Sequence, residues 1–318
     1  MTHRERAITA LKRGQPDHVP TFELVFHETE ADFQGRTFFG APGQPDPTGT
    51  TYEDQLRHNA QLYVDLARHF DHDILFLSSG TPPAAKDHLQ CLLDTAQAIR
   101  DIAGDEYLLM AHGDATYGVP SGQHMMDFVM WLADKPDEAK DQAKRSVDNM
   151  LEASRKMLEG GIEGFIQCSD YAFNSGPFLS PAMFAEFVTP FLKELTAQQR
   201  KMGAYVIKHT DGNIMPIIDQ LVDCEPHALH SLDPMAGVDI KYVKETYGDR
   251  IALCGNVHCA HLQTGTREEI AESAEYCLKW AKPGGGYIFC TSNCVFRGMP
   301  IESYHLIHSI WMKHRDYL

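Results

Sequence analysis

The stretch that decides the fold is Ala204-Tyr-Val-Ile-Lys-His-Thr-Asp-Gly-Asn213, a short apolar run that ends in polar residues. Two other runs have the same form, Arg250-Ile-Ala-Leu-Cys254 and a run over 286–294 that ends at Cys294. Short buried runs that alternate with amphipathic helices are typical of parallel βα units. In a closed barrel the C-terminal ends of such strands share one mouth. We therefore expect His209, Cys254 and Cys294 to meet there.

The alternation continues along the chain and predicts eight strands, at residues 19–25, 73–78, 107–111, 164–168, 205–208, 228–232, 251–254 and 287–290. Helical patterns fall at 4–12, 52–67, 95–102, 136–158, 182–202, 214–222, 240–247, 267–279 and 301–311. This pattern predicts an α/β fold of the (β/α)8 TIM barrel class, which commonly takes about 250 residues or more as one unit. We expect residues 1–318 to form a single domain. Residues 28–51, rich in Gly, Pro and Thr, are expected to form a long loop near the site.

The charge of the chain narrows the classes of partner. Lys and Arg number 28 and Asp and Glu number 44, so the net charge is −16, which disfavours nucleic acid as a partner. No apolar run reaches the roughly 18 residues that a membrane helix needs, and the first residues indicate an amphipathic helix rather than a signal peptide. The eight cysteines include no Cys-x-x-Cys pair and are expected to be reduced. We expect a cytoplasmic protein that acts on a small molecule, with homodimer formation left open.

Polar residues follow the predicted strands, as in an active site built from strand ends. One imidazole and two thiols, those of His209, Cys254 and Cys294, suit a zinc ion with an open position, and Asp211 or Glu23 are alternates for a fourth place. Packing of the two thiols into the barrel top is an equally good interpretation. The other candidates are acid–base groups and substrate-binding groups: Asp170, Tyr171, Asp211 and Asp233 for catalysis, and Glu23, His27, Tyr117 and Asn256 for substrate binding.

Two of these positions have a second interpretation from the sequence. Asp233 precedes Pro234 and is as well suited to capping a turn as to catalysis. His230 lies in a predicted strand of alternating character, and the periodicity does not decide whether its side chain points into the barrel or toward the helices.

The residues described so far resemble the uroporphyrinogen decarboxylase superfamily over nearly the whole chain. The matching stretches lie at 4–6 through 14–20, 175–181, 187–191, 208–213, 255–257, 265–270 and 284–288. The resemblance implies the (β/α)8 barrel fold. It also implies one of two activities: decarboxylation of a porphyrinogen without a cofactor, or methyl transfer with zinc and a corrinoid protein.

Departures from the family pattern separate these activities. Decarboxylases of the family bind substrate carboxylates with arginines in the loop after the first strand, whereas Arg36 is the only Lys or Arg between residues 14 and 56. Ser292-Asn-Cys294 stands where those enzymes carry Gly-His-Gly. The thiol-methylating branch has a cysteine two residues after its histidine, and this chain has Asp211 there. The resemblance is closer to the branch that demethylates O-methyl substrates.

We therefore expect a zinc-dependent methyltransferase that moves a methyl group from an O-methyl substrate, such as a methoxylated aromatic, to cobalamin on a partner corrinoid protein. Three alternatives stay open. The first is a metal-free decarboxylase of a tetrapyrrole or small carboxylate, with Asp211, Asp233 and Tyr171 acting on the substrate. The second is methyl transfer from a corrinoid to a thiol, and the third is a barrel that binds a corrinoid or tetrapyrrole without catalysis.

Overall fold

Seven parallel strands form the central sheet of the protein in a computed structural model that describes residues 1–26, 35–40, 49–78, 81–296 and 298–317. Their order is β1-β2-β3-β6-β7-β8-β9, and each strand runs parallel to its neighbours. The predicted α/β class and parallel sheet are thus confirmed. The strands are β1 (Ile74–Phe76), β2 (Leu108–His112), β3 (Gly164–Cys168), β6 (Tyr205–Thr210), β7 (Ala228–Ser231), β8 (Ala252–Cys254) and β9 (Tyr287–Ile288).

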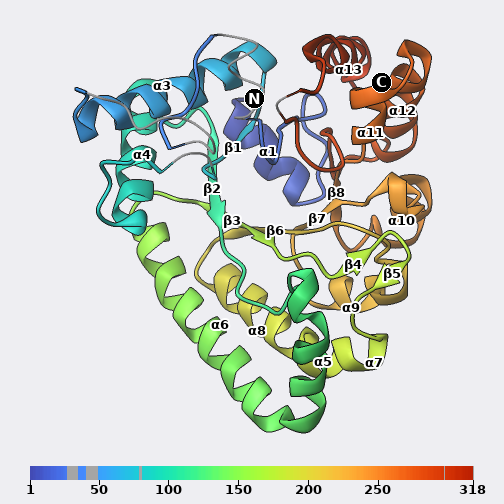
Figure 1. Ribbon diagram of the computed structural model, residues 1–318. Coiled ribbons are helices and arrows are strands. Elements are labelled where there is room, and N and C mark those ends of the chain that lie inside the picture. The colour runs from blue at the N-terminus through green and yellow to red at the C-terminus, as the bar shows by residue number, and fades with distance from the viewer. Residues whose placement is uncertain (27–34, 41–48, 79–80, 297, 318) are drawn as a thin grey trace.

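Helices surround the curled sheet, and α1 lies near the centre of the view (Figure 1). Thr2, Thr51 and Thr266 each form a capping box with an acidic residue three positions later, which fixes where α1, α3 and α12 begin. The α-helices of the described residues are α1 (His3–Leu11), α3 (Tyr52–Phe70), α4 (His88–Ala103), α5 (Met125–Asp134), α6 (Pro136–Glu159), α7 (Pro181–Phe187), α8 (Thr189–Lys201), α9 (Ile218–Asp223), α10 (Ile240–Tyr247), α11 (Cys259–Thr264), α12 (Arg267–Ala281) and α13 (Ile301–His314).

The helix predicted at 182–202 is two helices, α7 and α8. The helix breaks at Val188 because Pro190, in the first turn of α8, has no N–H to donate to the carbonyl of Glu186 and its ring clashes with that carbonyl in a continuous helix. The sequence prediction also missed α5, α11 and a short antiparallel hairpin made of β4 (Ala172–Phe173) and β5 (Gly176–Pro177). No helix among the described residues is both long enough and apolar enough to cross a membrane. The loop predicted at 28–51 lies largely outside the described residues.

The segment predicted as the first strand, 19–25, is not an extended strand. It makes one parallel bridge, between Thr21 and Phe289 just after β9, and the Thr21 carbonyl accepts a hydrogen bond from the backbone N–H of Asp73 just before β1. The segment therefore contacts both edge strands of the seven-stranded sheet. Val295 extends this contact by donating its backbone N–H to the carbonyl of Val25.

Two apolar layers follow from the alternation of side chains along the strands. One layer lies inside the curl of the sheet and includes Ile207, Ala228 and Cys254 together with Ala10 and Leu11 of α1. The other lies between the sheet and the surrounding helices and is the larger cluster. Helix α1 contacts β1, β2 and β9, so it covers the inner layer at the N-terminal end of the strands.

A buried ion pair holds α1 to the start of the sheet. Asp73 is fully buried, its Oδ1 accepts a hydrogen bond from Arg6 Nη1 at 2.6 Å, and its Oδ2 accepts one from the Thr21 backbone N–H at 2.8 Å. One carboxylate thus joins the first helix, the bridging segment and β1. Removing it would leave the Arg6 guanidinium buried with only part of its partners.

We predict that Asp73→Asn lowers the free energy of unfolding by about 2 kcal/mol or more, because the buried Arg6 guanidinium loses its fully buried carboxylate partner and keeps Asp17. Urea unfolding monitored by circular dichroism measures this. Glu152→Gln is the control, since it removes an equally direct ion pair, with Lys156 at 2.9 Å, on the solvent face of α6. It should leave the unfolding midpoint unchanged, and equal effects of the two substitutions would contradict the prediction.

Candidate active site

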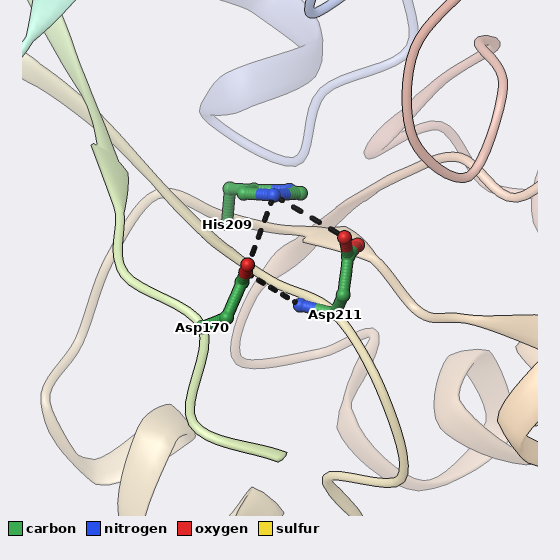
Figure 2. A group of neighbouring side chains, drawn as sticks. All are labelled: Asp170, His209 and Asp211. Carbon is green, nitrogen blue, oxygen red and sulfur yellow. Dashed lines mark hydrogen bonds and ion pairs between the residues drawn. The ribbon is translucent and has the colours of Figure 1, made fainter. Parts of the chain in front are cut away.

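Three polar side chains converge where β3 and β6 end. His209 lies in β6 opposite Cys168 of β3, and Asp170 and Asp211 follow two residues after each of these. His209 Nε2 lies 3.7 Å from Asp170 Oδ1 and 3.8 Å from Asp211 Oδ1. One ligand atom from each residue lies within 4.8 Å of the other two, a spacing that could hold a metal ion. In Figure 2 both carboxylates lie on the same side of the imidazole, and a dashed line joins each of them to His209 Nε2.

The His209 ring is neutral and oriented by a second histidine. Burial lowers the pKa of His209 to about 3, and the nearby Lys208 charge acts in the same direction. Its Nδ1 lies 2.7 Å from Nδ1 of His230, which is in register on β7. The neutral form is the one that binds metal ions. Because Nδ1 faces His230, Nε2 is the nitrogen that faces the two carboxylates.

Asp211 is the most perturbed acid of the group. Its pKa is raised to about 7, mainly by burial and also by the charges of Asp170 and Asp233, while the hydrogen bond from Asn293 acts in the opposite direction. Asn293 Nδ2 donates to Asp211 Oδ2. Asp211 Oδ1 is buried with no hydrogen-bond partner, so one acceptor oxygen is directed into the site without a donor. Such an orphaned acceptor beside a neutral imidazole suits a cation or a proton donor.

A second buried ion pair lies behind this group. Lys208, whose side chain is 1% exposed, donates from Nζ to Asp114 Oδ2 at 2.6 Å and to the backbone carbonyls of Gln167 and Ser169. Its Nζ lies 4.1 Å from the centre of the Tyr171 ring. The Lys208 ammonium group is thus paired with one carboxylate and two backbone carbonyls inside the protein. It does not reach the mouth as a free cation.

The structure does not bring the two predicted cysteine ligands to His209. Cys254 is fully buried in the inner apolar layer, opposite His230 and hence two strands away from His209, about 10 Å across the sheet. Cys294 is half-buried and lines a separate pocket of about 350 Å³ with Asp233 and Cys259. Among the residues that the structure describes, the group with metal-ligand spacing is Asp170, His209 and Asp211.

Several other predicted site residues are held by local hydrogen bonds. Asp233 caps a turn, accepting from the backbone N–H groups of Met235 at 2.9 Å and Gly212 at 3.3 Å. Tyr171 is buried, and its hydroxyl lies 2.5 Å from Thr116 Oγ1. The catalytic roles of Asp233 and Tyr171 stay predictions.

The predicted substrate-binding residues lie in three different settings. Tyr117 donates its hydroxyl proton to the Ala139 carbonyl at 2.8 Å, and Asn256 donates to the Leu232 carbonyl at 2.6 Å. Glu23 is buried at 6% exposure and accepts hydrogen bonds from the Thr291 side chain and backbone. His27 lies outside the described residues. Substrate binding by these four residues stays a prediction.

A cavity of about 690 Å³ opens beside the His209 group. His112, Cys168 and His209 line one end of it, at the ends of three neighbouring strands. The described residues that line it include no Lys, Arg, Asp or Glu. A space of this size and character accepts a drug-sized uncharged molecule with a large apolar surface. Leu24 and Val25 of the N-terminal segment and Leu77 also line the cavity. Further apolar lining comes from β1 and from helices α3, α4 and α6: Phe76, Tyr63, Leu89, Leu92, Met150, Ala153 and Met157.

Sequence reasoning missed the role of three residues. The strand alternation placed Lys208 on the face opposite His209, and a lysine inside a buried central strand signals an ion pair, but the sequence could not show that Asp114 is the partner. The direction of His230 was left open, because both faces of its strand are buried. Asn293 was noted only as part of the Ser-Asn-Cys stretch, and its contact with Asp211 spans 82 residues.

Residues 73–310 match the family described as uroporphyrinogen decarboxylase (URO-D). The chain belongs to this family of α/β proteins. Among solved structures, a methyltransferase from Methanosarcina mazei is similar over 98% of this chain and 99% of its own, with a TM-score of 0.74 and 19% sequence identity. At this identity the similarity establishes a shared fold.

Two further solved structures are more distant. D-psicose 3-epimerase from Clostridium cellulolyticum H10 has a TM-score of 0.45 and 11% identity, and covers 84% of this chain and 93% of its own. Cyclic alpha-maltosyl-(1→6)-maltose hydrolase from Arthrobacter globiformis has a TM-score of 0.47 and 11% identity, and covers 91% and 82%. No curated protein matches the chain in sequence.

The raised pKa of the buried Glu23 carboxyl predicts how the stability of the protein depends on pH. Burial raises the pKa of Glu23 to about 8, so the folded protein keeps the proton that the unfolded chain loses near pH 4.5. The free energy of unfolding therefore falls as the pH rises from about 4.5 to 8, by roughly 1 kcal/mol per pH unit for one proton. Glu23→Gln stays neutral and should lack this component.

Urea unfolding of both proteins at pH 5.5, 6.5 and 7.5 isolates this component as a difference between them. The stability of the wild type is expected to fall relative to the variant at each step. Parallel pH dependence of the two proteins would show that Glu23 titrates normally.

Proposed function

We propose that this chain is a zinc-dependent methyltransferase that moves a methyl group from an O-methyl substrate to cobalamin carried by a partner corrinoid protein. The observation that supports this most directly is the group of His209, Asp170 and Asp211 at the edge of an uncharged cavity. Membership of the uroporphyrinogen decarboxylase family supports an enzyme, and the shared fold with a methyltransferase supports this class of reaction.

The donor set fits a catalytic zinc ion. Catalytic zinc takes three protein ligands from His, Asp, Glu or Cys and keeps a fourth position open. One neutral imidazole nitrogen and two carboxylate oxygens meet that requirement, and the buried unpaired Oδ1 of Asp211 is a ready ligand atom. When bound, zinc would supply a Lewis acid beside the oxygen that loses the methyl group. The pair of thiols, Cys254 and Cys294, remains the rival ligand set.

The residues that line the cavity would bind and orient the substrate. The apolar walls of the cavity remove water from the uncharged part of the substrate and leave its methoxy group near His209. A carboxylate on the substrate would be disfavoured there, because the lining described above offers no cation to pair with it. The substrate class we propose is accordingly an uncharged methoxylated aromatic compound.

We also propose that the chain is one (β/α)8 domain, with residues 19–25 in the position of the eighth strand. The bridge of Thr21 to Phe289 and the hydrogen bond from Asp73 support this, since they connect the segment to both edges of the sheet. The corrinoid protein would approach the mouth formed by the strand ends. A homodimer remains compatible with this arrangement.

Zinc content separates the two ligand sets. We predict about one zinc ion per chain in the wild type, and a loss of affinity of at least about 100-fold in His209→Ala and Asp211→Ala, since even outer-shell changes cost 10- to 100-fold. The double variant Cys254→Ala, Cys294→Ala is the matched control and should keep its zinc. Elemental analysis after dialysis against a chelator measures this. Loss of zinc in the cysteine variant, with Asp211→Ala unaffected, would establish the thiols as ligands instead.

The cavity predicts substrate preference. With cob(I)alamin as acceptor, methoxybenzene should be demethylated to phenol faster than 4-methoxybenzoate, because the lining carries no positive charge. Ala153→Phe fills the cavity and should lower kcat/KM for methoxybenzene at least about 10-fold, whereas Ala185→Phe, at an exposed site on α7, should have no effect. Release of carbon dioxide from 4-methoxybenzoate would favour the decarboxylase alternative. Equal demethylation rates in Ala153→Phe and Ala185→Phe would exclude the cavity as the substrate site.

A further inference from the structure

Two buried imidazoles face each other inside the curl of the sheet. His209 and His230 lie on neighbouring strands in register, and their exposed fractions are 5% and 1%. Their Nδ1 atoms are 2.7 Å apart, and the Phe22 ring packs edge-on against His230 with centroids 5.7 Å apart. A contact this short between ring nitrogens is a hydrogen bond, so one nitrogen carries the proton and the other accepts it.

The position of that single proton decides what His209 can do. A hydrogen bond between two Nδ1 atoms can run in either direction, because a neutral imidazole carries one N–H on either of its two nitrogens. If His209 donates from Nδ1, its Nε2 is a bare lone pair that faces Asp170 and Asp211. If His230 donates instead, Nε2 of His209 holds the proton and cannot bind a metal ion.

We propose that His230 is a positioning residue that accepts the Nδ1–H of His209 and so presents the Nε2 lone pair of His209 to the metal. The inference rests on the proposed function, because His230 acts only through the metal ligand. Metal-binding histidines normally donate their other ring N–H to a carboxylate, a backbone carbonyl or water. Here a second imidazole, fixed on the adjacent strand, takes that place.

The geometry on the other side of the hydrogen bond sets its direction. A metal ion on Nε2 of His209 requires the proton of that ring to lie on Nδ1, and the ring nitrogen 2.7 Å away, Nδ1 of His230, must then accept it. The proton of His230 would lie on Nε2, which is buried and has no hydrogen-bond partner among the described residues.

The test compares two substitutions that differ only in the acceptor. His230→Ala removes it, whereas His230→Asn keeps an acceptor oxygen close to the former Nδ1 position. Zinc dissociation constants from chelator competition should rise about 10- to 100-fold in the alanine variant and stay close to the wild-type value in the asparagine variant. His227→Ala is the matched control, because His227 lies just before β7 and accepts from the Val206 N–H at the opposite end of the sheet. It should not change zinc binding.

Nitrogen NMR of the zinc-loaded wild type gives a second readout that a purely structural role would not produce. We expect a protonated Nδ1 on His209 and a bare Nδ1 on His230. An unprotonated His209 Nδ1 in that protein, unchanged zinc affinity in His230→Ala, or equal losses in the alanine and asparagine variants would overturn the proposal. If the wild type binds no zinc, the proposed function fails and the role of His230 fails with it. If only the His230 variants behave unexpectedly, the proposed function stands.

Discussion

In-register pairing of parallel strands is the constraint on which the site depends. Cys168, His209, His230 and Cys254 lie opposite one another on β3, β6, β7 and β8, so their side chains form one row at the same height inside the sheet. Each residue can reach only its immediate neighbours in that row, because adjacent strands are about 4.8 Å apart. His209 therefore meets His230, and Cys254 lies behind that histidine rather than beside His209.

Buried polar groups hold the N-terminal segment against the two edges of the curled sheet. Asp73 joins Arg6 to Thr21, and Glu23 receives the N–H and hydroxyl of Thr291 beyond β9. These contacts are costly to bury and costly to break, so they specify where the segment lies rather than adding much net stability. They position the residues after β9, including Asn293, which in turn donates to Asp211. The geometry of the candidate site is thus connected to the way in which the N-terminal segment contacts the last strand of the sheet.

The sequence predicted the fold better than the site, and the reason is physical. Seven strands were predicted correctly because apolar runs between amphipathic helices depend on local patterns, whereas residues 19–25 make mainly tertiary contacts and one bridge. Strand ends identified Asp170, His209 and Asp211 as candidates. Which of them meet depends on register and side-chain direction. The direction of His230 needed the structure, since both faces of a buried parallel strand are apolar.

The carboxylates at the C-terminal ends of β3, β6 and β7 favour the binding of a cation. Burial raises the pKa of Asp211, and repulsion by the charges of Asp170 and Asp233 raises it in the same direction. The lysine of β6, Lys208, is held by Asp114 behind the sheet. An anionic substrate would add to this repulsion with no positive group among the described lining residues to offset it. A divalent ion on His209 would instead stabilise the ionised carboxylates and leave the apolar cavity to an uncharged ligand. The same electrostatic argument accounts for the acidic group and for the uncharged cavity beside it.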